Sequence, residues 1–79
     1  MDRTLVTTES VTVDDRTFQV RFFESRTPRG QRRFSAEIVL APGDRIILDD
    51  DSLVSLAVRA RRLVPATVYS RALARTTAA

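Results

Sequence analysis

The strongest constraint on the fold is a pair of segments in which apolar and polar residues alternate. Residues 17–24 and residues 33–40 each place an apolar side chain at every second position. Because side chains of a β-strand point alternately to its two faces, this period predicts strands with one buried face. The buried sets are Phe18, Val20 and Phe22 in the first segment and Phe34, Ala36, Ile38 and Leu40 in the second.

Residues 27–31, which lie between these segments, predict a tight hairpin. Pro28 suits the second position of a type I turn, and Gly30 suits the left-handed position of a G1 bulge. This turn sets a register that keeps apolar residues opposite apolar ones, because a slip of one residue would exchange the two faces. The predicted pairs are Phe18 with Leu40, Val20 with Ile38, Phe22 with Ala36 and, on the other face, Arg21 with Glu37.

Two shorter strands are expected outside the hairpin. The first covers residues 10–13, with a possible start at Leu5, and a turn near residues 14–16 follows it. The second covers residues 45–48, after the turn signal at residues 41–44. The expected pairs are Val13 with Phe18, Val11 with Val20, Leu40 with Ile46, Ile38 with Leu48 and Val39 with Ile47.

The C-terminal third predicts helix. The acidic residues 49–51 and Ser52 supply caps for free backbone N–H groups, and residues 52–64 carry an apolar stripe at helical spacing. Pro65 is expected to end or kink this helix and to begin a short second one over residues 66–74. Residues 76–79 are expected to form a frayed tail.

Together these elements predict one α+β domain over residues 1–75. A four-stranded antiparallel meander carries the main helix on its apolar face. The expected core consists of the apolar face of every element: Val11, Val13, Phe18, Val20, Phe22, Phe34, Ala36, Ile38, Leu40, Ile46, Leu48, Leu53, Leu56, Ala57, Ala60 and Val64.

The composition argues against catalysis. The 79 residues include no His and no Cys, which removes the commonest general base and the thiol nucleophile. The paired acids at Asp14-Asp15 and at residues 49–51 fall in a turn and at a helix start, where Asp satisfies backbone donors. We therefore expect no enzyme, no cofactor and no metal site.

All thirteen basic residues are Arg, and eleven of them lie in two blocks, residues 16–33 and residues 52–79. This usage is typical of a GC-rich coding sequence and favours a bacterial source. The net charge of +3 is too small to indicate nucleic acid by itself. Arg is nevertheless the side chain suited to bidentate contacts with phosphate or carboxylate.

Three groups of residues are candidate binding sites. The hairpin tip forms a basic finger, the uncovered sheet face holds an aromatic ring among Arg side chains beside an apolar pair, and the helix carries further Arg. The tip residues are Arg26, Arg29, Arg32 and Arg33. The face residues are Arg21, Phe23, Val39 and Ile47, and the helix residues are Arg59, Arg61 and Arg62.

The C-terminal segment also resembles a bacterial helix-turn-helix. The likeness lies in Ala60 before an expected turn, in Ala66-Thr67-Val68 and in Ser70-Arg71. The sequence departs from that pattern where Arg61 or Arg62 replaces the usual turn Gly and where Tyr69 is an additional residue. The resemblance implies that the basic C-terminal helices contact nucleic acid.

Two functions follow from these features. The first is a small non-catalytic module whose open sheet face binds a protein partner or a second copy of the chain. The alternative is a nucleic-acid-binding regulator that uses the hairpin and the basic helix. The start of the chain has no apolar signal segment, and no apolar run is long enough for a bilayer, so we expect a cytoplasmic protein without membrane contact.

Overall fold

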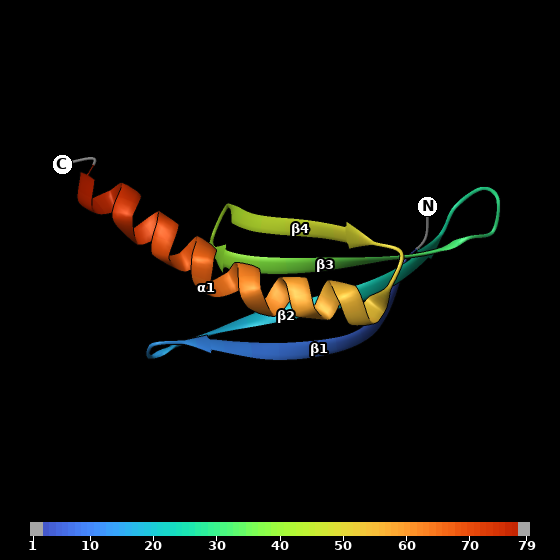
Figure 1. The fold of residues 1–79 in the computed structure, drawn as a ribbon, viewed down its shortest axis with the longest axis horizontal. Helices are drawn as coiled ribbons and strands as arrows, with labels where there is room; N and C mark the ends of the chain where they lie inside the picture. Colours follow the sequence, from blue (N-terminus) through green and yellow to red (C-terminus); the bar gives the residue numbers. More distant parts are fainter. Residues whose placement is uncertain (1–2, 78–79) are drawn as a thin grey trace.

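A computed structural model describes residues 3–77 of the chain. Four strands, β1 (Thr4–Val13), β2 (Arg16–Arg26), β3 (Arg32–Ala41) and β4 (Asp44–Asp50), precede one helix, α1 (Leu53–Thr77). The strands form one antiparallel sheet in the order β1-β2-β3-β4 (Figure 1). The predicted α+β meander with a C-terminal helix is confirmed.

The β2–β3 hairpin has the predicted register. Val20 pairs with Ile38, Arg21 with Glu37 and Phe22 with Ala36. At the tip, the Gly30 N–H donates to the Thr27 carbonyl at 2.8 Å, and Gly30 has a φ of 84°. These features are the expected turn with a left-handed residue at its end.

The registers of the two outer strands differ from the prediction by two residues. Val11, not Val13, lies opposite Phe18, and Ile46, not Leu48, lies opposite Ile38. Both connections are two-residue turns, in which Asp14 and Gly43 have positive φ values of 55° and 77°. The short turn accounts for the β1–β2 register, and in the β3–β4 pair a register shift between Val39 and Ala41 adds to it. A shift of two residues leaves every side chain on its predicted face.

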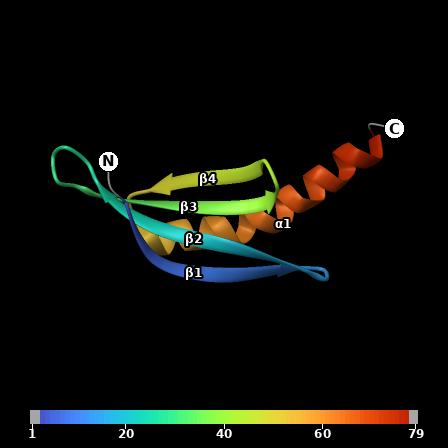
Figure 2. The same cartoon turned by 180° about the vertical axis from the view of Figure 1, so that it is seen from behind.

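Figure 2 shows the sheet from the side that α1 leaves open, with the helix lying behind it. The buried cluster joins the inner faces of β2 and β3 to the helix residues Leu56, Ala60 and Val64. Every residue of the predicted core belongs to this cluster or packs against it, and Val68 packs against it as well.

Residues 50–52 begin the helix as the acidic run predicts. Ser52 is the cap, since its hydroxyl accepts the Ser55 N–H at 3.2 Å. The Asp50 carboxylate accepts the Ser52 N–H and the Ser55 hydroxyl, each at 3.0 Å. The chain is thereby held at the corner where it leaves β4.

The prediction of two helices separated at Pro65 is wrong. Helix α1 continues through Pro65 to Thr77, so residues 66–74 are its second half. Pro removes a backbone donor, but Val64 and Val68 both pack against the core and hold the turns on either side. A helix-turn-helix needs two helices, so this resemblance does not extend to the structure.

The second half of α1 extends past the end of the sheet that carries the β1–β2 and β3–β4 turns (Figure 1). Of the expected frayed tail, residues 76 and 77 belong to the helix, and residues 78 and 79 lie outside the described residues. Within residues 3–77, no helix has the length and apolar character required to cross a membrane.

Ile38 and Val39 provide a matched test of the face assignment. Ile38 is fully buried and Val39 is 49% exposed. Ile38→Ala should lower the free energy of unfolding by about 2–5 kcal/mol, because it leaves a cavity in the core. Val39→Ala should cost about 0.5 kcal/mol or less. Urea denaturation measures both, and a loss under about 1 kcal/mol for Ile38→Ala would contradict the packing.

The cap predicts a second change in stability. Ser52→Ala removes the acceptor for the Ser55 N–H and should lower the free energy of unfolding by about 1 kcal/mol. Ser52→Asp retains an acceptor and should stay close to the original protein in the same urea titration. Equal losses for the two variants would contradict a capping role.

Candidate functional site

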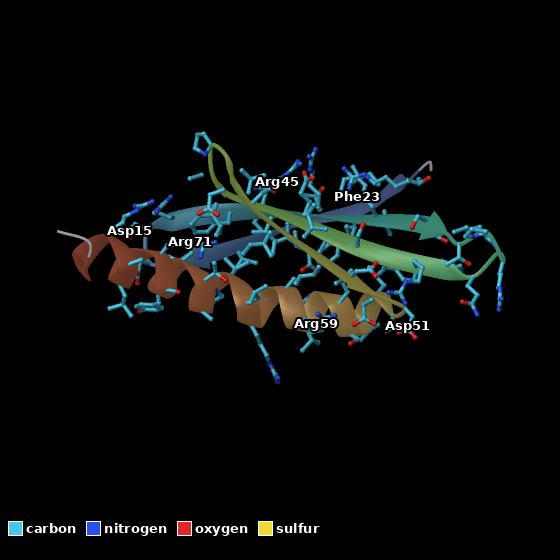
Figure 3. The ribbon with its side chains drawn as sticks, turned by 90° about the horizontal axis from the view of Figure 1, so that it is seen from above. Asp15, Phe23, Arg45, Asp51, Arg59 and Arg71 are labelled. Atoms are coloured by element: carbon cyan, nitrogen blue, oxygen red, sulfur yellow. The ribbon has the colours of Figure 1, made fainter. Side chains whose placement is uncertain are left out.

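The face of the sheet opposite α1 has no covering element among residues 3–77. Figure 3 shows Arg45 and Phe23 on this side of the sheet, away from the helix. Strand alternation, the observed register and the contacts of Arg3 with Phe23 and Glu37 place four Arg residues and two acidic residues on it. These are Arg3, Arg21, Arg33, Arg45, Glu37 and Asp49, and we refer to this surface as the open face.

Glu37 is the centre of the open face. Its side chain is only 4% exposed, although it lies on the uncovered side of the sheet. Arg21 binds the Glu37 Oε1 at 2.5 Å, and Arg45 and Arg3 lie 3.5 and 3.6 Å from Oε2. Three guanidinium groups therefore surround one carboxylate and shield it from water.

This arrangement fixes the protonation state of Glu37. The hydrogen bond from Arg21 lowers the pKa of the Glu37 carboxyl below its ordinary value, and the charges of Arg45 and Arg3 add to this effect. The carboxylate is thus ionised at neutral pH. One negative charge against three positive ones leaves a local excess of two positive charges.

Phe23 does not have the exposure that the sequence suggested. It was expected to be an accessible ring for stacking, but it is only 8% exposed. The Arg3 guanidinium lies 3.9 Å from the ring centroid, and the Arg21 guanidinium lies 5.7 Å from it. The ring therefore forms part of the support for the Glu37 cluster, because cations over its face are electrostatically favoured.

Arg3 is the site residue that the sequence did not reveal. The β1–β2 register shifts between Leu5 and Thr7, so Leu5 lies opposite Phe23 rather than on the core face. A β-bulge changes which residues share a face, and periodicity alone does not show where a bulge falls. The shift brings Arg3 to Phe23 and Glu37.

Exposed apolar side chains border the Glu37 cluster. Val39 is 49% exposed and Ile47 is 56% exposed. The prediction that they pair directly is wrong, because Val39 lies opposite Arg45 and Ile47 lies opposite Glu37. They are diagonal neighbours on the open face, still close enough to form one apolar edge.

The hairpin tip is less basic than its sequence suggests. Arg32 binds Glu24 at 2.6 Å, and Arg33 is paired with Asp49 on β4. Arg26 donates to the Gly30 carbonyl at 3.4 Å. Within residues 3–77, Arg26 and Arg29 are the tip residues without an acidic partner, so half of the expected basic finger is neutralised.

The helix Arg residues mostly connect the helix to the sheet. Arg59 binds the Asp50 carboxylate and the Asp49 carbonyl, each at 3.0 Å. Arg61 binds Glu9 of β1 at 2.8 Å. Arg62 is exposed and has no acidic partner among the described residues. Two of the three predicted helix residues, Arg59 and Arg61, therefore connect the helix to the sheet.

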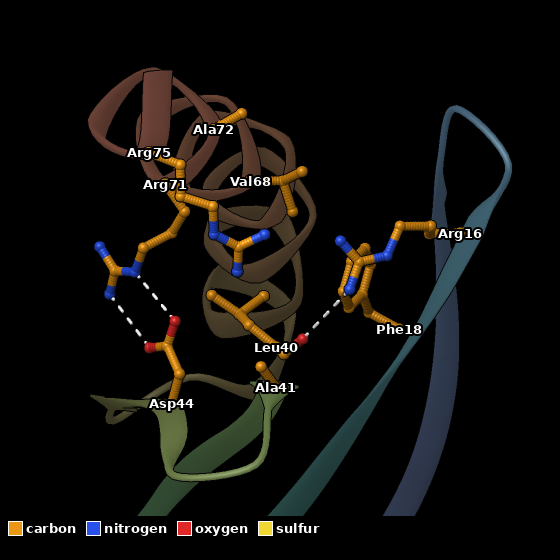
Figure 4. Close-up of a pocket in the computed structure, with 9 residues that line it drawn as sticks. All are labelled: Arg16, Phe18, Leu40, Ala41, Asp44, Val68, Arg71, Ala72 and Arg75. Atoms are coloured by element: carbon orange, nitrogen blue, oxygen red, sulfur yellow. Dashed lines mark hydrogen bonds and ion pairs between the residues drawn. The ribbon is translucent and has the colours of Figure 1, made fainter. Parts of the chain in front are cut away.

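A small hollow lies where the second half of α1 passes the β3–β4 turn (Figure 4). It encloses about 60 Å³ over an apolar floor that includes Phe18 and Leu40. Arg71 binds Asp44 through two hydrogen bonds of 3.0 and 3.2 Å, which lower the pKa of that carboxyl together with the charge of Arg75. This contact anchors the helix beyond Pro65.

Acidic residues do not form a metal site in the part of the chain described. Within residues 3–77, no three His, Cys, Asp or Glu side chains lie together as ligands. The Asp50 carboxylate is engaged by the helix cap and by Arg59, and these contacts lower its pKa.

Comparison of the chain with protein-family models, curated proteins and solved structures found no match.

The Glu37 cluster predicts an acid-sensitive fold. Since the folded pKa of Glu37 lies below its ordinary value of 4.5, the stabilisation is complete above that pH and is lost as pH falls through the folded pKa. Urea midpoints should therefore fall on acidification below about pH 4.5. The carboxyl groups of Glu24, Asp44 and Asp50 also have lowered pKa values, so they add to the loss of stability at low pH.

Glu37→Gln isolates the contribution of this one carboxylate. The variant should be less stable at pH 7, because three Arg lose their counter-charge, and its stability should vary less with pH between 3 and 5. Glu24→Gln is the matched control, since its single ion pair lies at the exposed hairpin. If the two variants lose an equal amount of unfolding free energy at pH 7, the Glu37 cluster stabilises the fold no more than the single exposed ion pair does.

Proposed function

We propose that this protein is a small non-catalytic interaction module whose open face binds an acidic surface of a protein partner. The observation that carries the proposal is the shielded Glu37 carboxylate beneath Arg3, Arg21 and Arg45. The Arg side chains are held in place from below and are 45%, 51% and 63% exposed. They are thus preorganised donors on a surface that nothing covers among residues 3–77.

The chemistry of this surface suits carboxylates. The open face has four Arg against two acidic residues, and Arg33 is already paired with Asp49. The remaining excess lies around Glu37, where guanidinium groups still have outward N–H donors. Planar guanidinium groups form bidentate bonds with carboxylates, and fixed side chains lose less entropy on binding.

The apolar edge supports a protein partner rather than a free ion. Val39 and Ile47 stand beside the basic centre with about half of each side chain exposed. Protein interfaces combine apolar contact area with Arg, and a charged centre gives orientation and a faster association rate. A partner with Asp or Glu beside an aliphatic residue would complement both features.

Charge argues against self-association through this same face. Two copies placed face to face would bring together two excesses of positive charge. Like charges across an interface cost binding free energy unless counter-charges intervene. The protein-partner version of the sequence-based proposal is therefore favoured over the dimer version at the open face.

Nucleic acid is the alternative partner, through Arg26, Arg29 and the open face. Its support is weaker, because Arg32 and Arg33 are paired with acids and the Phe23 ring is covered by Arg3. Single-strand binders use accessible aromatic rings for stacking. We place the protein in the cytoplasm under either proposal, as its sequence favours.

A titration with two labelled probes separates the partners. The probes are an acidic peptide that contains Glu and Leu and a single-stranded oligonucleotide, each followed by fluorescence anisotropy at low ionic strength. We expect the peptide to bind and Arg45→Gln to weaken it by roughly fivefold, since one of three guanidinium groups is lost. Arg29→Gln, at the hairpin tip, is the matched control and should leave peptide binding unchanged.

Three outcomes would contradict the proposal. Peptide binding that Arg29→Gln weakens as much as Arg45→Gln would indicate attraction by overall charge. Oligonucleotide binding that is tighter than peptide binding and falls steeply with salt would favour nucleic acid. A lack of binding to either probe would remove the open face as a charged binding surface.

A further inference from the structure

The outer face of α1, which points away from the sheet, is unusually apolar for a solvent-exposed helix face. Val58 is 41% exposed, Tyr69 is 59% exposed and Leu73 is 65% exposed. Arg62 and Ala66 are also exposed on this face, and Pro65 is partly exposed. At 3.6 residues per turn, these positions form one stripe along most of the helix.

The order of residues in this outer stripe is self-complementary. When the helix is placed beside an antiparallel copy of itself, with Pro65 opposite Ala66, two further matches follow. Val58 of one copy meets Leu73 of the other, and Arg62 meets Tyr69. Each pair occurs twice about the twofold axis, as in any antiparallel pairing of identical helices. What this sequence adds is that the paired side chains match chemically: apolar with apolar, and Arg with an aromatic ring.

We propose that two copies of this chain associate through an antiparallel pairing of their α1 outer stripes. The small Ala66 side chain and the compact Pro65 ring lie at the twofold axis, where they allow the helices to approach closely. Apolar pairs between Val58 and Leu73 flank the axis. Arg62, which has no acidic partner among residues 3–77, stacks on the ring of Tyr69 from the other copy.

Electrostatics permits this arrangement. The two Arg62 side chains would be separated along the helix by seven residues, or about 10 Å at the α-helical rise, which is close to the Debye length at physiological salt. The neighbouring Arg59 and Arg61 are already paired with Asp50 and Glu9 of their own chain. Within residues 3–77, Arg62 is therefore the one unpaired charged residue of the stripe, and no further like charges meet across the interface.

The shape of the molecule also permits the pairing. The stripe lies on the opposite side of α1 from the core residues Leu56, Ala60 and Val64. The second half of the helix extends beyond the end of the sheet (Figures 1 and 2). A dimer would have the layers sheet, helix, helix and sheet. Both open faces would remain accessible, so this inference is independent of the proposed partner binding.

Sedimentation equilibrium of the full chain over about 1 μM to 1 mM tests the association. We expect a reversible dimer with a mass twice that of the monomer. Tyr69→Arg should weaken it by roughly tenfold or more, because Arg would then lie opposite Arg62. The double variant Arg62→Tyr with Tyr69→Arg exchanges the partners and should restore most of the affinity.

A single cysteine provides an independent test of the register. The chain contains no Cys, so Ala66→Cys introduces one thiol at the proposed twofold axis. Facing helices bring Cα atoms at such a position within disulfide range. Mild oxidation should produce a covalent dimer quickly, whereas Ala41→Cys, on the β3 end, should remain largely monomeric.

Several results would overturn the inference. The first is a strictly monomeric protein over the whole concentration range. The second is a dimer that Val39→Asp or Ile47→Asp disrupts while Tyr69→Arg does not, which would assign self-association to the open face. The third is failure of the double variant to recover affinity although its circular dichroism and thermal melt match those of the original protein.

Discussion

The packing of α1 onto the inner faces of β2 and β3 is the contact on which the rest of the structure depends. Val20, Phe22 and Ile38 from the sheet and Leu56 and Val64 from the helix are its largest fully buried side chains. Apolar burial of this kind supplies most of the stability of a chain near the lower size limit for a single core. The single helix of residues 3–77 covers one face of the sheet, so the open face is a direct consequence of this packing.

The uncovered face explains how the Arg residues are used. A four-stranded sheet with an apolar outer surface would aggregate, and charged side chains on such a surface oppose that outcome. Here the Glu37 cluster lies at the middle of the sheet, and the Arg33–Asp49 pair lies near the ends of β3 and β4. Other Arg residues, among them Arg59, Arg61 and Arg71, connect the helix to the sheet. Most of the positive charge in the sequence thus has an acidic partner within the chain.

Two surfaces of different character remain. The open face carries an excess of positive charge beside a small apolar edge, which suits an acidic partner and opposes contact with itself. The outer stripe of α1 is largely apolar and self-complementary. If both proposals hold, one dimer would present two open faces, and a partner with two acidic sites would bind with increased avidity.

The sequence by itself determined the fold class, the β2–β3 register and the composition of the core. Those properties depend on local rules: a period of two for strands, a Pro and a Gly at defined turn positions, and a period near 3.6 for the helix. The same rules placed Val39 and Ile47 on the open face and paired Arg21 with Glu37. They could not supply the outer registers, because Asp14 adopts a left-handed conformation that is uncommon outside Gly and because the β3–β4 register shifts between Val39 and Ala41.

Tertiary structure alone decided the remaining features. Pro65 is a helix breaker by local rules, yet core contacts of Val64 and Val68 keep α1 continuous. Phe23 was expected to be accessible, but the bulge in β1 brings Arg3 over its ring and beside Glu37. Arg32 and Arg33 of the hairpin were expected to be free, but they form ion pairs with Glu24 and Asp49. In each case the deciding contact joins separate elements, and pairing between elements is what a local pattern does not contain.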